Sequence, residues 1–127
     1  HLLAIPSYHE GFCRPVAEGL RAGCIPVVYD AYNLPHIAGQ LGRVVPAGDI
    51  EALAAAMEEL AQAVPLALAR TAEPVLPIDR GLVSADDFTR LAHQHTAGFT
   101  FATLGGEMRQ RLLTALARQG QRRSNPA

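Results

Sequence analysis

The sequence contains no lysine, and all eleven of its basic residues are arginines. A reaction step that needs a lysine must therefore be served from outside these 127 residues. Arginine is as suitable as lysine on a solvated surface. A coding bias that also favours alanine therefore explains the absence more simply than function does.

Cysteine is scarce as well. Cys13 and Cys24 match neither a C-x-x-C motif nor a zinc-binding spacing, and two cysteines are too few for a disulfide framework. We therefore expect a reducing, cytoplasmic location. His93 and His95 are two positions apart, whereas helical ligand pairs are spaced i, i+4. They are predicted to be a surface pair, and we expect no metal.

Long hydrophobic runs and a large net charge are also absent. No segment approaches the roughly 18 apolar residues of a membrane span, and no charged leader precedes an apolar core. A net charge of −1 gives no electrostatic reason to expect a nucleic acid partner. The length suits one domain or part of one. An apolar run follows His1 directly, with no preceding turn or cap. We therefore expect the first element of this sequence to be an internal element of a fold.

Three short apolar runs predict strands. "LLAIP" at 2–6 predicts a buried strand of a parallel sheet rather than a half-exposed one. "IPVVYD" at 25–30 is rich in β-branched residues and predicts a second buried strand, while "GRVVPAGD" at 42–49 contains a brief third.

Helices are predicted between and after these strands. One begins near Pro15 and ends at Gly23. A second, over 50–64, is capped by Asp49 and is amphipathic. Its apolar stripe consists of Leu53, Met57, Leu60 and Val64. This alternation predicts an α/β fold, a partial Rossmann-like parallel sheet with right-handed crossovers, although a complete open sheet has about five or six strands.

The rest of the chain gives weaker patterns. Residues 65–80 carry three prolines and predict an irregular connection. "SADDFTRLAHQH" predicts a short helix capped by Ser84 or Asp86. A final helix is expected over about 104–118, with the last residues, 118–127, frayed.

Two carboxylates stand close together in "PSYHEGFCRPVAEG". Glu10 lies in the loop that follows the first strand, and Glu18 lies one turn into the helix after it. Ligands of α/β sheets bind at such loops, and a helix N-terminus suits a diphosphate. Carboxylates on either side would accept hydrogen bonds from sugar hydroxyls, which fits a nucleotide-sugar. The alternative is that the spacing is coincidental and Glu18 only stabilises the helix.

The longer segment "PSYHEGFCRPVAEGLRAGCIPVV" resembles the donor-binding signature of the retaining, GT-B fold glycosyltransferases of the group-1 type. The matching positions are Pro6, Ser7, Glu10, Gly11, Phe12, Pro15, Glu18, Ala22, Gly23, Pro26, Val27 and Val28. "LPHIAGQLGRVVPAGDIEALAAAMEEL" and "FTFATLGGEMRQRLLTAL" are similar to later parts of the family. The resemblance covers 1–64 and 99–116.

The resemblance implies a catalytic and sugar-binding role for Glu10 and a ribose-binding role for Glu18. The backbone of the segment between them would face the sugar and the diphosphate, at Gly11, Phe12, Cys13 and Arg14. It also implies a nucleotide-diphosphate sugar as donor substrate, no cofactor, no metal, and an acceptor hydroxyl on a glycan, lipid or small molecule. Residues 1–98 would be the C-terminal half of a GT-B domain, and 99–127 a closing helix and tail.

The sequence departs from the family pattern at three positions. Cys13 stands where glycine is usual, and a side chain there would restrict the approach of the sugar. Gly19 replaces an alanine at a helix cost of about 0.5–1 kcal/mol. His36 replaces a glutamate. The arginine and lysine that the family places upstream are missing, as is the N-terminal acceptor-binding domain. We expect part of an enzyme, inactive alone; the alternative is a non-enzymatic module that binds a nucleotide or a protein.

The C-terminal segment is strongly basic. Residues 107–127 contain a single acid, Glu107, and five arginines, at 109, 111, 118, 122 and 123. A solvated helix face with a mobile tail explains them, and the alternative is weak attraction to an anionic membrane surface.

Overall fold

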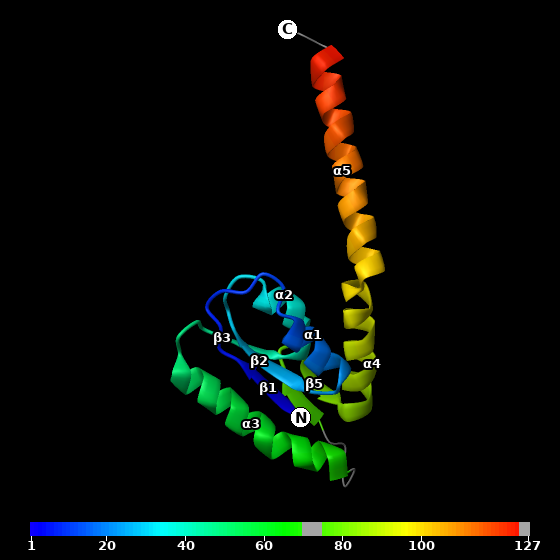
Figure 1. The fold of residues 1–127 in the computed structure, drawn as a ribbon. Helices are drawn as coiled ribbons and strands as arrows, with labels where there is room; N and C mark the ends of the chain where they lie inside the picture. The colour runs from blue at the N-terminus through cyan, green and yellow to red at the C-terminus, as the bar shows by residue number, and fades with distance from the viewer. Residues whose placement is uncertain (70–74, 125–127) are drawn as a thin grey trace. The chain divides into compact units, whose positions relative to one another are not determined.

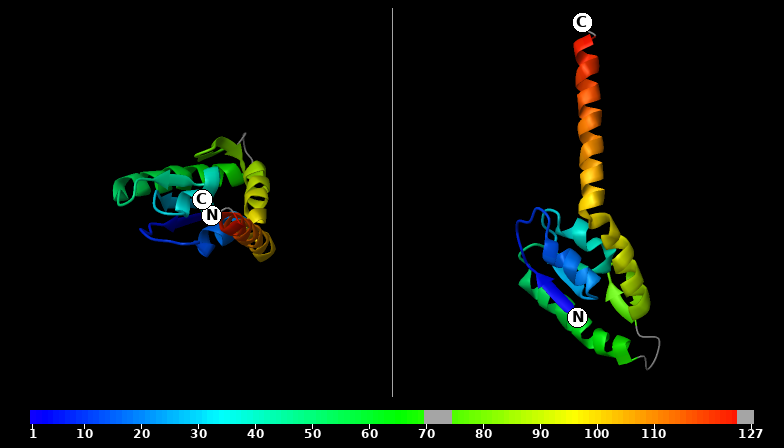
Figure 2. Two further views of the ribbon diagram at one scale, coloured as in Figure 1. Left: turned by 90° about the horizontal axis from the view of Figure 1, so that it is seen from above. Right: turned by 45° about the vertical axis from the view of Figure 1, so that its right-hand side comes forward.

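The computed structural model describes residues 1–69 and 75–124, and their contacts divide the chain into two units, His1–Thr96 and Ala97–Ala127. The first unit is built on a parallel sheet with helices on both faces: α3 covers one face, and α1 and α2 the other (Figures 1 and 2). The predicted fold class, a partial Rossmann-like α/β sheet, is confirmed. The predicted domain boundary at residue 98 stays a prediction.

The parallel sheet has the strand order β1-β2-β3, with β1 at Leu2–Ile5, β2 at Ile25–Tyr29 and β3 at Arg43–Val45. Leu3 pairs with Pro26, and Val28 pairs with Val44. Every residue of β2 is buried, as the run of apolar residues predicted. All three predicted strands are therefore present.

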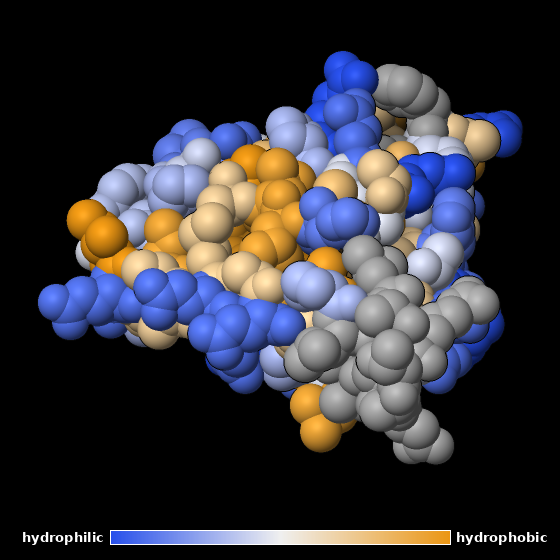
Figure 3. Space-filling model, turned by 90° about the horizontal axis from the view of Figure 1, so that it is seen from below, coloured by the Kyte–Doolittle hydropathy of each residue, from blue (hydrophilic) through white to orange (hydrophobic). Residues whose placement is uncertain are grey.

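The prediction that β1 is buried is wrong. Its four residues are each half-exposed, because β1 pairs with β2 on one side and with no strand of the described residues on the other. The view from below shows hydrophobic side chains gathered beside the hydrophilic outer side of α3 (Figure 3), on the side where β1 lies. Among the described residues, β1 is therefore paired on one side only.

Helix α1, Arg14–Arg21, crosses from β1 to β2 and buries Val16, Ala17 and Leu20. It ends where predicted, since Gly23 adopts the left-handed conformation with φ +80°. A Cβ on Gly19 would lie 2.7 Å from Leu3 Cδ2. Gly19 therefore lets β1 and α1 pack closely, which offsets its cost to the helix.

After β2, the chain forms α2, Leu34–Ala38, and a 3₁₀ turn, η1, Gly39–Leu41. Helix α3 then spans Ile50–Ala69. Asp49 Oδ1 accepts a hydrogen bond of 2.8 Å from Ala52 N–H, which confirms the predicted cap. On the predicted stripe, Leu60 and Val64 are buried. The helix continues through Pro65 and past its predicted end at Val64.

A hairpin replaces much of the irregular connection predicted for 65–80; residues 70–74 lie outside the described residues. It consists of β4, Val75–Ile78, and β5, Gly81–Ser84, which pair antiparallel. Asp79 in its turn accepts a hydrogen bond from Val44 N–H at Oδ2 (2.9 Å) and donates its own N–H to Gly42 O (2.9 Å). The turn therefore covers the outer edge of β3, which would otherwise expose unpaired backbone groups.

Helix α4, Ala85–Thr96, completes the first unit. Ser84 Oγ accepts from Asp87 N–H at 3.1 Å, so Ser84 rather than Asp86 is the cap. The prediction of a surface histidine pair is wrong for His95, which is half-buried with Nε2 2.9 Å from Ile37 O. His93 is exposed. The helix turns these neighbouring side chains in different directions, and only His95 faces α2.

The second unit consists of a short 3₁₀ turn, η2, Ala97–Phe99, and the long helix α5, Phe101–Ser124. Thr100 Oγ1 accepts from Thr103 N–H at 3.1 Å and caps the start. The helix is longer than the predicted 104–118, and the prediction that 118–124 is frayed is wrong; 125–127 lie outside the described residues. Arginine, glutamine, alanine and leucine, all strong helix formers, fill most of its length. No described helix is long and apolar enough to cross a membrane.

Candidate functional site

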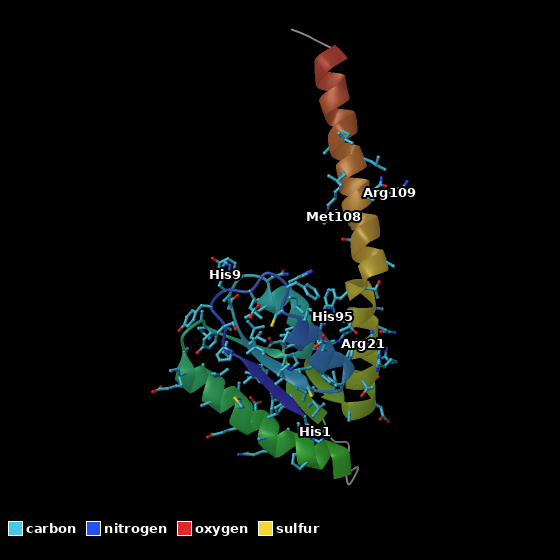
Figure 4. The ribbon with its side chains drawn as sticks, in the orientation of Figure 1. His1, His9, Arg21, His95, Met108 and Arg109 are labelled. Carbon is cyan, nitrogen blue, oxygen red and sulfur yellow. The ribbon has the colours of Figure 1, made fainter. Side chains whose placement is uncertain are left out.

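Three loops meet at one edge of the parallel sheet. They follow β1, β2 and β3 and comprise residues 6–13, 30–33 and 46–49. Because the strands are parallel, the loops that follow them lie at the same edge, which is where α/β sheets bind ligands. In Figure 4, His9 lies near this edge, while His1 lies at the opposite one.

Aromatic contacts join the first of these loops to the other two. The Tyr8 ring packs against Tyr29 at the end of β2, with ring centroids 5.5 Å apart. Its hydroxyl lies beside Gly48, where a Cβ would come within 2.9 Å and φ is +85°. The His9 ring meets Tyr32 edge-on at 4.2 Å. The loops are therefore held in a defined arrangement.

A hydrogen bond fixes the backbone of the first loop. Asn33 Nδ2, just before α2, donates to Gly11 O at 3.0 Å across 22 positions of sequence. Its neighbour Tyr32 adopts φ +48°, a backbone conformation that residues other than glycine rarely take. The backbone next to Glu10 is thus positioned by residues that follow β2.

Glu10 and the start of α1 lie close together. The Glu10 side chain is half-buried, and its negative charge contributes to raising the pKa of the Cys13 thiol. Cys13 is the residue immediately before α1. Glu10 therefore lies near enough to the start of α1 for its charge to act on Cys13, while its role in binding stays a prediction.

The backbone donors at this N-terminus are partly used within the chain. Arg14 N–H donates to Phe12 O at 3.0 Å, Val16 N–H donates to Cys13 O at 3.1 Å, and Pro15 has no N–H. Within the described part of the chain, neither Gly11 N–H nor Cys13 N–H has a hydrogen-bond partner. Of the amides predicted to face a ligand, these two have no partner among the described residues, and Gly11 is exposed whereas Cys13 is buried.

Glu18 forms an ion pair with Arg14. Arg14 Nη2 lies 3.0 Å from Glu18 Oε1, and the two side chains are 78% and 63% exposed. An exposed i, i+4 pair of this kind contributes only about 0.3–0.5 kcal/mol. Both side chains can therefore be redirected to a ligand at low cost.

Cys13 does not obstruct the loop surface, although it replaces a glycine of the family pattern. Its side chain is only 3% exposed and packs into the core. Burial raises the pKa of the thiol, the Val16 backbone hydrogen bond opposes part of this rise, and the Glu10 charge adds a smaller rise. Burial and the raised pKa both favour the neutral form of this thiol.

We expect this thiol to make the protein less stable at high pH. Because its pKa is raised in the folded state, folding favours the protonated form, and stability falls as pH rises above about 9. In a Cys24→Ser background, we expect a smaller loss of unfolding free energy between pH 8 and 10 once Cys13 is replaced by alanine. Urea denaturation at each pH measures this, and equal losses with and without Cys13 would contradict it.

Neither the cavity at the opposite edge of the sheet nor any cluster of metal-binding side chains among the described residues offers a second candidate site. A cavity of about 60 Å³ at the opposite sheet edge is lined by Ile25, Val64, Leu76 and Phe88, among others. Binding sites for small molecules are usually at least about 300 Å³. Among the described residues, no group of three histidine, cysteine, aspartate or glutamate side chains could hold a metal ion. The absence of a metal stays a prediction.

Sequence reasoning found the two glutamates but missed the residues that position the loops around them: Tyr8, Tyr29, Tyr32, Asn33 and Gly48. Each lies at or after the end of a predicted strand. This position at the end of a strand is the feature of the sequence that could have identified them, since loops that follow parallel strands lie at the same edge of the sheet.

The fold and the site define an α/β protein in which carboxylates flank a helix N-terminus at the carboxyl edge of a parallel sheet. The model of the family described as glycosyl transferases group 1 matches residues 1–68, more than half of the chain. The chain belongs to this family. No curated protein and no solved structure gives a significant match. Family membership indicates glycosyl transfer from a donor to an acceptor.

Proposed function

We propose that the chain binds a nucleoside-diphosphate sugar at the carboxyl edge of β1–β3 and serves retaining glycosyl transfer to an acceptor hydroxyl in a GT-B type enzyme. The observation that carries the proposal is the placement of Glu10 and Glu18 on either side of the start of α1. Between them lie the two unpartnered N–H groups, of Gly11 and Cys13, within the described chain. Family membership supports the reaction class.

In this proposal each part of the donor has its own partner. The diphosphate lies at the N-terminus of α1, where the helix dipole and the N–H groups of Gly11 and Cys13 favour an anion. Glu10 accepts hydrogen bonds from hydroxyls of the sugar, and Glu18 from those of the ribose. Phe12, 40% exposed, lies in the same loop and offers an apolar surface to the sugar.

Arg14 changes partner when the donor binds. In the structure its guanidinium pairs with Glu18. A diphosphate carries more charge than one carboxylate and accepts bidentate hydrogen bonds from arginine. Arg14 therefore turns to the diphosphate and releases Glu18 Oε1 to the ribose. The chain has no lysine that could take this role. Arg14 is the first residue of α1 and is therefore the cationic side chain nearest to the helix start in sequence.

The chemistry follows from where charge develops. The bond between the anomeric carbon and the diphosphate oxygen breaks, and its electron pair leaves with the diphosphate. The acceptor hydroxyl forms the new bond on the same face and gives its proton to the leaving oxygen. Donors aimed at growing negative charge usually contribute most to such a reaction. The N-terminus of α1 and Arg14 supply them, while Glu10 orients the sugar; the donor is a substrate, and no cofactor is required.

Isothermal titration tests the proposal with a panel of UDP-glucose, GDP-mannose, ADP-glucose and the three corresponding nucleoside diphosphates. We expect at least one sugar nucleotide to bind, together with its diphosphate. Glu18→Ala should weaken both at least tenfold, because it removes charge-assisted bonds to the ribose that both ligands share. Glu107→Ala removes a comparable exposed helical glutamate from α5 and should change neither affinity.

Two results would refute the proposal. One is that none of the six ligands binds. The other is that Glu18→Ala and Glu107→Ala give the same affinity, which would remove the ribose-binding role of Glu18.

A further inference from the structure

Tyr32 carries an exposed side chain on an unfavourable backbone conformation. The residue is 73% exposed, and its φ is +48°. A Cβ raises the energy of this left-handed region, so glycine is preferred there, and asparagine is tolerated better than tyrosine. Burial of the ring does not offset the strain, because the ring is in solvent. Strained residues of this kind gather at functional sites. The stability of the fold therefore does not explain a tyrosine at this position.

The contacts of Tyr32 and its neighbour Asn33 tie this turn to the segment that contains Glu10. The Tyr32 and His9 rings meet edge to face, with centroids 4.2 Å apart and an interplanar angle of 69°. Asn33 Nδ2 donates to Gly11 O. An edge-to-face contact covers at most one face of either ring. The Tyr32 ring is therefore held beside Glu10 while keeping a face open to a ligand.

Exposed aromatic rings gather at this edge of the sheet. Among the described residues, the exposed phenylalanine and tyrosine side chains are Tyr8, Phe12 and Tyr32, and all three lie in the loops that follow β1 and β2. A tyrosine offers an apolar ring face and a polar tip. A pyranose has the complementary surface, because its axial C–H groups form an apolar patch and its hydroxyls project from the rim.

The charged side chains of the three loops are all acidic. Residues 6–13, 30–33 and 46–49 contain Glu10, Asp30 and Asp49 but no arginine. Asp49 caps α3, and Asp30 is exposed. Carboxylates accept hydrogen bonds from hydroxyls and repel other carboxylates. This edge therefore favours an uncharged sugar over one that carries an acid group.

We propose that the sugar of the donor is a neutral pyranose whose apolar face stacks on the ring of Tyr32, beside Glu10. The C–H groups of the sugar, which carry a small positive charge, lie on the negative face of the aromatic ring. Glu10 accepts hydrogen bonds from hydroxyls on the rim of the same sugar. The inference rests on the donor site proposed above, and it adds the chemical class of the sugar and a residue that selects it.

The order of the donor's parts argues against the nucleobase as the partner of Tyr32. In the proposed site, Glu18 binds the ribose, so the base lies on the side of α1. Tyr32 instead contacts His9, the residue before Glu10. The ring therefore lies at the sugar end of the donor.

Isothermal titration of the full chain tests the role of Tyr32, with the tightest-binding sugar nucleotide and its nucleoside diphosphate. Tyr32→Gly should weaken the sugar nucleotide about tenfold, because the sugar loses an apolar contact, and should leave the diphosphate unchanged. Tyr32→Asn, which also suits a left-handed backbone, should do the same. Tyr32→Phe should stay within about threefold of the wild type, since the ring remains. Tyr32→Gly should melt within about 2 °C of the wild type, because glycine relieves the strain.

A second titration tests the charge of the sugar. Each hexose nucleotide is compared with the uronate that carries the same base, as in UDP-glucose and UDP-glucuronate. The uronate should bind at least about tenfold more weakly, because its carboxylate would lie near Glu10 and Asp30. Leu82→Ala, which removes an exposed apolar side chain of β5, is the control and should change no affinity.

Three results would overturn the inference while leaving the donor site in place. The first is that Tyr32→Gly and Tyr32→Asn bind the sugar nucleotide as tightly as the wild type does. The second is that they weaken the nucleoside diphosphate equally, which would assign Tyr32 to the base or to the fold. The third is that the uronate binds as tightly as the hexose. If no nucleotide binds at all, the donor site is refuted and this inference fails with it.

Discussion

Replacing Gly42 by alanine should lower the free energy of unfolding of the first unit by about 3 kcal/mol, the upper end of what overpacking of a core costs. Gly42 is buried immediately before β3. A Cβ at this position would overlap the carbonyl oxygen of Pro26 and lie 2.9 Å from Pro26 Cγ. The obstacle is the backbone of β2, which cannot rotate away as a side chain would. Urea denaturation followed by circular dichroism measures the loss.

Gly11→Ala is the matched control. No atom lies within 4 Å of where its Cβ would be, and its φ is not positive. We expect its unfolding free energy to stay within about 0.5 kcal/mol of that of the wild type. If Gly42→Ala were as stable as Gly11→Ala, the close packing of β3 on β2 would be wrong, and so would the position of the loop at 46–49.

Replacing Glu10 by glutamine should weaken binding of the sugar nucleotide about 10- to 100-fold and leave the affinity for the nucleoside diphosphate unchanged. The substitution keeps the size of the side chain and removes its charge. Hydrogen bonds to a charged group contribute about 1.5–3 kcal/mol, which gives the expected range. The diphosphate alone has no sugar to contact Glu10, so it should not respond. Titration with both ligands measures the difference.

This pattern separates the roles of the two glutamates. Glu18 variants should weaken both ligands, whereas Glu10 variants should weaken only the ligand that carries a sugar. Glu58→Gln, an exposed glutamate of α3, controls for the change in net charge. Equal weakening of both ligands by Glu10→Gln would show that this carboxylate acts on the diphosphate or the loop and does not contact the sugar.

Much of the first unit could be predicted from sequence because its signals are local. Asp49 caps α3, and Gly23 ends α1, through interactions within a few residues. The burial of β2 also follows from its own composition. The half-exposure of β1 could not be predicted this way, because it depends on which strands lie beside it and not on its own residues.

The hairpin of β4 and β5 was missed for a similar reason. Its strands are short, and Pro77 lies within β4, where proline argues against a strand. The contacts that hold the hairpin in place are remote in sequence: Val44 N–H donates to Asp79 Oδ2, and Arg43 Nη1 donates to Pro77 O at 3.1 Å. Contacts over more than thirty positions leave no periodic pattern in the sequence.

In the candidate site, too, the residues with a local sequence signal could be predicted and those placed by remote contacts could not. Glu10 and Glu18 could be singled out because both lie in one segment at a predicted strand-to-helix junction. Asn33, which bonds to Gly11 O, and Tyr32, which packs on His9, come from the next loop. Their roles depend on how two loops approach each other in space. Sequence spacing therefore predicts the chemistry of the site better than the residues that position it.

The most direct test of the central claim is an amide NMR titration of ¹⁵N-labelled protein with the nucleoside diphosphate that binds most tightly. We expect chemical-shift changes concentrated in residues 8–14, 30–33 and 46–49, with the amides of Gly11 and Cys13 among the largest. Shifts concentrated instead around Ile25, Val64 and Phe88, at the opposite edge of the sheet, would contradict it.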